Sequence, residues 1–154
     1  MTSSIQSFSI HPASWKEHEA EIRKVRQKVF IEEQSVPAEL EWDGEDPLCI
    51  HLLARSMDNQ PMGTIRLKDD GKIGRLAVLE NWRAKGVGRA LMAAIMARAL
   101  AEGITNLYLD AQVRALGFYE KFGFVARGPV FDDAGIDHKR MVLEHPPLFD
   151  SPDE

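Results

Sequence analysis

The sequence has one cysteine, Cys49, and no apolar run long enough to cross a membrane. A single cysteine excludes an internal disulfide and is typical of a protein from a reducing compartment. We interpret Cys49 as a small apolar side chain rather than a nucleophile, because it lies between Leu48 and Ile50. The start of the chain lacks the cationic-then-apolar pattern of a secretory signal. We therefore expect a cytoplasmic protein that does not bind a membrane.

The sequence also lacks a surplus of basic residues and any recognisable metal or nucleotide motif. Its net charge of −5 argues against a nucleic-acid partner. Its histidines have no metal-ligand spacing, so we expect no metal. The G-x-G that begins at Gly86 fails the dinucleotide fingerprint at its last glycine, and no P-loop occurs. ATP and NAD are therefore poor fits.

Composition and length are typical of one globular domain. Apolar residues make up 44% and charged residues 28% of the 154 positions, which is enough apolar content for a core. No repeat or second domain is visible. We therefore expect a single domain over residues 1–154, with loose tails at residues 1–4 and 145–154.

Hydrophobic spacing predicts an alternation of strands and helices. Ser14 and Glu17 form an S-x-x-E capping box, which predicts a helix over residues 15–30. A second long helix is expected after Gly86, ending at Gly103. A short helix is expected over 114–122 and an acidic loop over 39–47. Strands are expected over residues 5–10, 50–56, 62–67, 72–78, 104–111, 124–127 and 137–143. This order predicts an α+β fold with a mostly antiparallel sheet.

The stretch Arg83-Ala84-Lys85-Gly86-Val87-Gly88 is the most informative part of the chain. It places cations and two glycines where a helix begins. A helix N-terminus has unpaired N–H groups and a positive dipole end, so the stretch predicts a phosphate or pyrophosphate seat. Taken alone, it can equally be read as two glycines and some surface cations at a helix entrance.

A second motif, Ala115-Leu116-Gly117-Phe118-Tyr119-Glu120-Lys121-Phe122-Gly123-Phe124, decides between these readings. The two motifs together resemble the GNAT superfamily of N-acetyltransferases, and the strands over 63–67 and 73–78 fit it. Residues 25–34, followed by Val36-Pro37, resemble its ElaA/YjcF-like branch. The resemblance covers residues 20–143. It implies an α/β/α sandwich with a mixed, mostly antiparallel sheet of about seven strands. The fourth and fifth strands would splay apart to admit acetyl-CoA.

The resemblance also implies where acetyl-CoA binds. Backbone groups of the third central strand would pair with the pantetheine arm, and the glycine-containing loop would hold the pyrophosphate. Gln112 stands where many relatives have Asn, so a pantetheine contact there is plausible with altered geometry. The implied cofactor residues are Leu76, Ala77, Val78, Arg83, Ala84, Lys85, Gly86, Val87, Gly88, Arg89, Ala90, Gln112 and Tyr119.

The reaction implied is acyl transfer from a thioester to an amine. Tyr119 stands where the family often places a general acid, and its ordinary pKa near 10 suits donation to a leaving thiolate. Glu33 is the candidate catalytic base, with His51 and His138 as further substrate contacts. Each also has a structural reading, as a solvated helix end or a packed strand histidine. The amine could instead lose its proton through a water chain.

The sequence therefore predicts an N-acetyltransferase that moves an acetyl group from acetyl-CoA to a primary amine by direct attack in a ternary complex. Two alternatives stay open: a non-catalytic acyl-CoA sensor, and an enzyme acting on protein lysines or N-terminal amines. The acidic residues over 39–46 could attract a cationic amine or form a solvated loop. A small amine is the expected partner, and homodimer formation is left open.

Overall fold

The computed structural model describes residues 7–144, which build two antiparallel sheets. The larger sheet contains β1 (Phe8–Ala13), β2 (Ile50–Ser56), β3 (Pro61–Leu67) and β4 (Ile73–Val78), in that spatial order. The smaller sheet has the order β5-β7-β6. Its strands are β5 (Tyr108–Gln112), β6 (Phe124–Asp133) and β7 (Ile136–Leu143). The expected tails at 1–4 and 145–154 lie outside the described residues.

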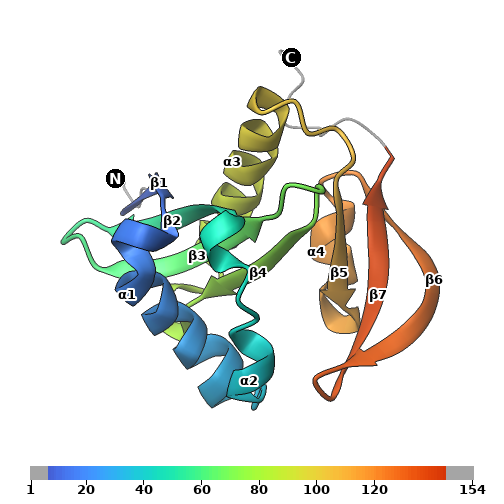
Figure 1. Cartoon of the computed structure of the whole chain (residues 1–154), viewed down its shortest axis with the longest axis horizontal. Helices are drawn as coiled ribbons and strands as arrows, with labels where there is room; N and C mark the ends of the chain where they lie inside the picture. Colours follow the sequence, from blue (N-terminus) through green and yellow to red (C-terminus); the bar gives the residue numbers. More distant parts are fainter. Residues whose placement is uncertain (1–6, 145–154) are drawn as a thin grey trace.

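Helices cover both faces of the larger sheet, as the resemblance implied (Figure 1). On one face lie α1 (Trp15–Arg26), its π-helical continuation η1 (Gln27–Glu33) and the short α2 (Ala38–Glu41). On the other lies α3 (Val87–Ala101), while α4 (Leu116–Glu120) packs against β5 and β6. Short 3-10 turns occupy Asp46–Leu48, Glu80–Trp82 and Val113–Ala115. No helix among the described residues is both long and apolar enough to span a membrane.

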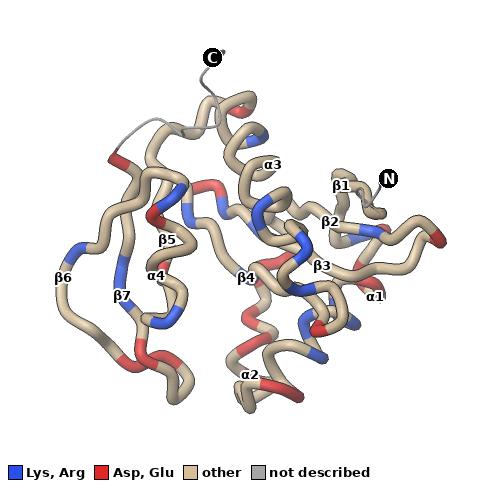
Figure 2. The backbone as a smooth tube through the Cα atoms, turned by 180° about the vertical axis from the view of Figure 1, so that it is seen from behind, with Lys and Arg blue, Asp and Glu red and all other residues tan. Residues whose placement is uncertain are grey.

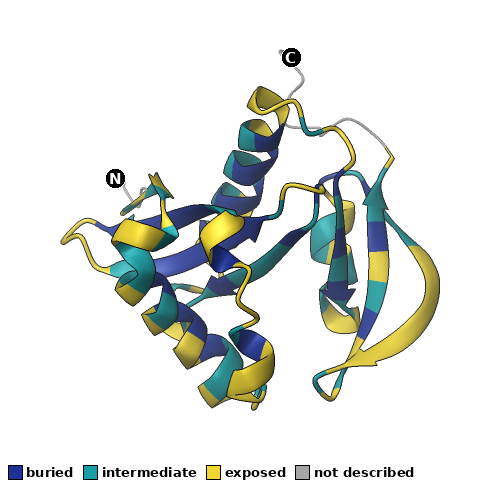
Figure 3. Cartoon of the chain, viewed as in Figure 1, coloured by how far each residue is buried: buried dark blue, intermediate teal, exposed yellow. Residues whose placement is uncertain are grey.

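The core lies between α3 and the sheets. Leu91, Met92 and Ile95 of α3 are fully buried, and they share a cluster with β2, β3, β5 and β7. Gly63 lets α3 approach β3 closely, since a Cβ there would lie 3.1 Å from Leu91 and from Val87. Buried positions accordingly concentrate on the central strands and the inner side of α3 (Figure 3).

The two sheets meet at one point and then separate. An isolated parallel bridge joins Lys72 to Tyr108, and the Tyr108 amide donates to the Gly71 carbonyl at 3.1 Å. A Cβ at Gly71 would lie 2.1 Å from the Asn106 carbonyl oxygen, so only glycine fits where the chains approach. Beyond this bridge β4 and β5 diverge, which confirms the splayed strands expected from the resemblance (Figure 1).

Several predicted elements have different limits. Strand β2 spans the predicted residues 50–56, but β1 runs over Phe8–Ala13 rather than 5–10. The first helix continues to Glu33 because η1 follows α1 without a break. Strand β5 begins only at Tyr108 rather than at residue 104.

The last hairpin is much longer than predicted. Strand β6 continues through Pro129 to Asp133, where a loop was expected. The pairing of β6 with β7 shifts between Arg127 and Phe131, and Gly128 has a φ of 80°. A bulge on an edge strand tolerates a proline, because the missing N–H is not needed for pairing. Here the bulge lets β6 resume its pairing with β7 beyond Pro129.

Candidate functional site

A cavity of about 720 Å³ opens between the diverging strands. Its walls come from β4, the loop into α3, the end of β5, α4 and the η1–α2 segment. Most of the predicted cofactor residues line it, namely Leu76, Val78, Arg83, Ala84, Gly86, Val87, Gly88, Arg89, Gln112 and Tyr119. A volume of this size is typical of a small-molecule site.

Three predicted cofactor residues lie elsewhere. Ala77 points to the opposite face of β4, where it packs with Val25 and Val29. The Lys85 ammonium lies 5.8 Å from the centre of the Trp82 ring. The Ala90 amide already donates to the Gly86 carbonyl at 3.0 Å, so it is not available to a ligand.

The loop into α3 has the backbone shape of an anion seat. Gly86 precedes the helix with a φ of 88°, a left-handed conformation that favours glycine, and Ala84 has a φ of 61°. No side chain of the described residues caps the helix. The amides of its first turn are therefore free to meet an anion. Figure 2 shows basic positions along the chain leading into α3.

Gly88 opens this seat toward the cavity. A Cβ at Gly88 would lie 3.7 Å from the Phe118 ring and 3.9 Å from Val78, which are ordinary contact distances. Gly88, Phe118 and Val78 all line the cavity. A side chain at position 88 would therefore occupy ligand space without disturbing the core.

A bulge in β4 shapes the opposite wall. Thr64 pairs with Ala77, but Arg66 pairs with Gly74, so β4 holds one extra residue in this interval. Arg75 lies at the bulge and has a left-handed φ of 53°. A bulge leaves backbone groups unpaired, and Arg75 and Leu76 line the cavity at this point. The spacing of apolar residues gave no sign of this bulge.

Arg83 is held by two partners. Its guanidinium donates to both carboxylate oxygens of Glu33, at 2.6 and 3.0 Å, and its Nε donates to the Val78 carbonyl at 2.9 Å. The Arg83 hydrogen bond lowers the pKa of Glu33, which makes this carboxylate a weaker proton acceptor. Glu33 itself does not line the cavity.

Two linked side-chain hydrogen bonds cross the cavity next to this ion pair. Gln112 at the end of β5 donates to Gln34 at 3.0 Å, and Arg114 donates to Gln112 at 3.1 Å. Gln34 directly follows η1 and was not predicted as a site residue. The end of η1 therefore contacts both walls, β4 through Arg83 and β5 through Gln112.

Tyr119 lies in the cavity wall, as predicted. Burial raises the pKa of its hydroxyl to about 12, so the group is protonated at neutral pH. The Phe118 ring packs edge-on against the Tyr119 ring, with the ring centres 5.0 Å apart, and holds the phenol ring in place. Within residues 7–144, no group hydrogen-bonds to the Tyr119 hydroxyl. This leaves the hydroxyl able to donate to a ligand.

The two predicted histidines have different surroundings. His51 is 1% exposed, does not line the cavity, and has Nε2 2.9 Å from the Asp46 carbonyl oxygen. His138 of β7 lines the cavity and stacks on Phe131. Its Nδ1 lies 2.7 Å from the Ile136 carbonyl. A carbonyl can only accept, so Nδ1 is the donor and Nε2 of the neutral ring keeps a lone pair.

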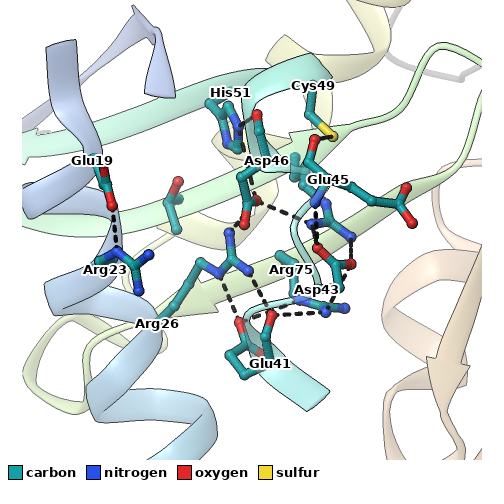
Figure 4. Close-up of polar contacts among 12 residues, drawn as sticks. Glu19, Arg23, Arg26, Glu41, Asp43, Glu45, Asp46, Cys49, His51 and Arg75 are labelled. Carbon is teal, nitrogen blue, oxygen red and sulfur yellow. Dashed lines mark hydrogen bonds and ion pairs between the residues drawn. The ribbon is translucent and has the colours of Figure 1, made fainter. Parts of the chain in front are cut away.

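Two carboxylates of the acidic stretch over 39–47, Glu41 and Asp46, are buried in an ionic cluster (Figure 4), whereas Glu39, Asp43 and Glu45 are exposed. Glu41 and Asp46 are 3% and 2% exposed, and Arg26 binds both, at 2.7 and 2.6 Å. Arg66 binds Asp46 and Asp43, each at 3.0 Å. Sequence reasoning missed this cluster because its arginines lie far from the carboxylates in sequence.

The cluster extends to the cavity through Arg75, which reaches Glu41 at 3.2 Å and Asp43 at 3.3 Å. Partial burial acts to raise the pKa of Asp43, but the Arg66 hydrogen bond and nearby charges outweigh it and lower the pKa to about 2. Asp43 is therefore ionised, and arginines bind both carboxylates, whereas burial raises the pKa of Glu41. Cys49 is half-buried nearby, and burial raises the pKa of its thiol.

Among residues 7–144, no group of three or more His, Cys, Asp or Glu side chains is arranged to hold a metal ion.

The fold is that of the acyl-CoA N-acyltransferases, and comparison with known proteins agrees. The model of the acetyltransferase (GNAT) domain matches residues 16–145, so the chain belongs to the GNAT acetyltransferase family. It is 38% identical to the N-acetyltransferase YjcF of Bacillus subtilis, over 78% of this chain and 88% of YjcF.

Solved structures place the chain in the same branch. An acyl-CoA N-acyltransferase from Pseudomonas aeruginosa is 30% identical with a TM-score of 0.77, over 89% of this chain and 98% of that one. Escherichia coli ElaA superposes with a TM-score of 0.80 at 26% identity, over 88% of this chain and 99% of ElaA. The predicted resemblance to the ElaA/YjcF-like branch is confirmed.

Proposed function

We propose that the protein transfers an acetyl group from acetyl-CoA to a primary amine by direct attack in a ternary complex. The observation that carries this proposal is the uncapped start of α3, which opens into a cavity that also holds the Tyr119 hydroxyl. An anion seat and a proton donor on the walls of one cavity are what a CoA thioester needs from an acyltransferase.

The donor would bind along β4 and the loop into α3. The first-turn amides of α3 and the exposed Arg89 would hold the pyrophosphate, and Leu76 and Val78 would pair with the pantetheine arm. In the free protein, the Arg83 Nε donates a hydrogen bond to the Val78 carbonyl. We infer that Arg83 turns to the pyrophosphate when the cofactor binds. Glu33 would then be released, and only then could it act as a base.

The chemical step needs several proton movements. The ammonium first loses a proton to water. The neutral amine attacks the thioester carbon, and its excess proton passes to Nε2 of His138 or to water. Collapse of the intermediate expels the CoA thiolate, which takes the Tyr119 proton, and Tyr119 regains a proton from His138 or water. Acetylated amine and free CoA result. His51 is too buried to join this step and serves a structural role. The single half-buried cysteine suits a cytoplasmic location.

The test is release of free CoA from acetyl-CoA in the presence of a panel of primary amines. Release that depends on the amine supports transfer. Gly88→Val is the control, because a Cβ at this position makes only ordinary contacts with Phe118 and Val78 and the rest of the side chain would occupy the seat. We expect it to weaken acetyl-CoA binding tenfold or more, about 1.4 kcal/mol, in calorimetry.

Two other results would favour the alternatives. Tight acetyl-CoA binding with no release for any amine would support a non-catalytic acyl-CoA sensor. Release with lysine peptides or free protein N-termini, but not with small amines, would support a protein acetyltransferase.

A further inference from the structure

The η1–α2 segment and the β6–β7 hairpin contribute apolar side chains to the cavity. Phe30 of η1, together with Val36 and Leu40, contributes side chains from one lip. Ile136 of β7 contributes from the facing hairpin. Leu40 is 53% exposed, so its side chain is accessible at this lip of the cavity. Figure 1 shows α2 and the β6–β7 hairpin at the same end of the molecule, on either side of the opening.

The carboxylates in this cavity are almost all neutralised. Glu41 and Asp43 are bound by arginines of the buried cluster. Asp110 is bound by Lys72 at 3.1 Å and by Arg140. Asp133 at the end of β6 also lines the cavity, and within the described residues it forms no ion pair. One free carboxylate can hold one ammonium group, and several cationic groups would find no partners.

We propose that the acceptor is a primary monoamine with an apolar body, either aryl or branched alkyl. This inference rests on the proposed transfer reaction. The apolar body lies between Leu40 and Ile136, and the ammonium enters beside Asp133. Polyamines and lysine-rich peptides are excluded, because their additional charges would lie against an apolar wall. Leu40 and Asp133 are thus specificity-determining residues.

The same apolar lining could hold a long acyl chain of the donor instead. We assign it to the acceptor because Val36 and Leu40 lie on the η1–α2 side, across the sheet from α3 and its anion seat. A substrate that enters independently of CoA would come from this open side. The experiment therefore includes a donor of longer chain.

The experiment measures CoA release with 2-phenylethylamine, ethanolamine and spermidine at saturating acetyl-CoA. We expect the highest kcat/KM for 2-phenylethylamine. Leu40→Ser should raise the KM for 2-phenylethylamine about three- to tenfold. It should leave the KM values for ethanolamine and acetyl-CoA unchanged. Leu48→Ser is the matched control, because Leu48 is 84% exposed and lies outside the cavity.

A second pair of variants tests the ammonium site. Asp133→Asn should raise the KM for 2-phenylethylamine and ethanolamine alike, by about tenfold, with kcat retained. Asp137→Asn is the control, since Asp137 is exposed in the same hairpin and does not line the cavity.

Distinct results would overturn the inference. Equal or better use of ethanolamine or spermidine leaves the transfer reaction standing but makes the apolar acceptor wrong. A higher KM for octanoyl-CoA in Leu40→Ser, with an unchanged amine KM, assigns the lining to the acyl chain. If acetyl-CoA binds in calorimetry but no amine releases CoA, the proposed transfer fails and this inference fails with it.

Discussion

At the scale of single residues, the two tyrosines provide a comparison inside one protein. Tyr119 lines the cavity with a hydroxyl that nothing in the described chain engages. Tyr108 lies where the sheets meet, and its hydroxyl donates to Asp70 at 2.6 Å. The pKa of each is raised to about 12, by burial at Tyr119 and mainly by the Asp70 hydrogen bond at Tyr108. The two hydroxyls thus have similar pKa values, but within the described residues only the Tyr119 hydroxyl is free to donate to a ligand in the cavity.

Replacing Tyr119 by Phe removes the hydroxyl and keeps the ring packed against Phe118. If Tyr119 protonates the leaving thiolate, kcat should fall roughly 10²–10⁴-fold, while acetyl-CoA affinity and melting temperature stay constant. Because its pKa is about 12, the hydroxyl stays protonated over the assay range. Its ionisation should therefore cause no loss of wild-type kcat up to about pH 10.

Steady-state kinetics on Tyr119→Phe and on the matched Tyr108→Phe provide the measurement. Tyr108→Phe should keep kcat, because Tyr108 does not line the cavity. A kcat for Tyr119→Phe within about threefold of the wild type would assign the proton to water or the departing ammonium.

Sequence reasoning at this scale succeeded where a motif fixes local backbone. Ser14 accepts a hydrogen bond from the Glu17 amide at the start of α1, as the S-x-x-E pattern predicts. Sequence reasoning could not place His51 or Glu33, because the residues that pack on them or bind them, Trp15 and Arg83, lie far away in the chain. Asp46 lies in the 3-10 turn before β2, and its carbonyl contacts His51. Glu33 binds Arg83, which is fifty positions later in the chain. One sequence without its fold contains no signal for such pairs.

At the scale of elements, the ion pairs of the buried cluster connect the α2 segment to α1 and to the larger sheet. Arg26 extends from the end of α1 and binds carboxylates on both sides of the turn that follows α2. Periodicity assigned Arg26 only to the first helix, and Glu41 and Asp46 were expected either to attract a cationic amine or to lie in a solvated loop. Their burial follows from the fold bringing opposite charges together, since an isolated buried charge would be too costly.

We therefore expect Arg26→Met to destabilise the protein by about 3–5 kcal/mol, because Glu41 and Asp46 would lose their main counter-ion while buried. Arg23→Met is a close control on the same helix. Both guanidinium groups lie over the Trp42 ring, at 4.5 Å for Arg23 and 5.0 Å for Arg26. The side chain of Arg23 is 43% exposed, so its ion pair with Glu19 should contribute less than about 1 kcal/mol.

Urea unfolding at neutral pH measures both variants. Similar losses for Arg23→Met and Arg26→Met would mean that packing on Trp42, rather than charge neutralisation, stabilises this region.

At the scale of the whole molecule, one bridge joins the two sheets, and β4 and β5 diverge beyond it. The element order and the two motifs predicted this arrangement through the family resemblance. The depth of the cavity and its closure by η1 could not be predicted, because they depend on side chains such as Gln34 and Gln112 that meet across the gap. The larger sheet and α3 together contribute most of the core, and the sheet does not depend on a ligand for its pairing.

Acetyl-CoA should therefore stabilise the molecule unevenly. A pantetheine arm along β4 and a pyrophosphate on the first turn of α3 would restrain groups that lack backbone partners in the free protein. We expect slower amide hydrogen exchange over residues 74–78, 85–89 and 108–112 when acetyl-CoA is added, with β1 and β2 unchanged. Global unfolding should also become harder, by about 2.7 kcal/mol at a hundredfold excess over Kd.

Exchange measured by mass spectrometry on the wild type and on Gly88→Val separates local from general effects. Gly88→Val should show weaker protection at the same acetyl-CoA concentration, because a side chain at this position occupies the seat and lowers the affinity. Protection spread evenly over β1, β2 and β4 would mean that the ligand stabilises the fold as a unit. Protection confined to the β6–β7 hairpin would place the cofactor in the acceptor half of the cavity, and the assignment of the two halves would then be reversed.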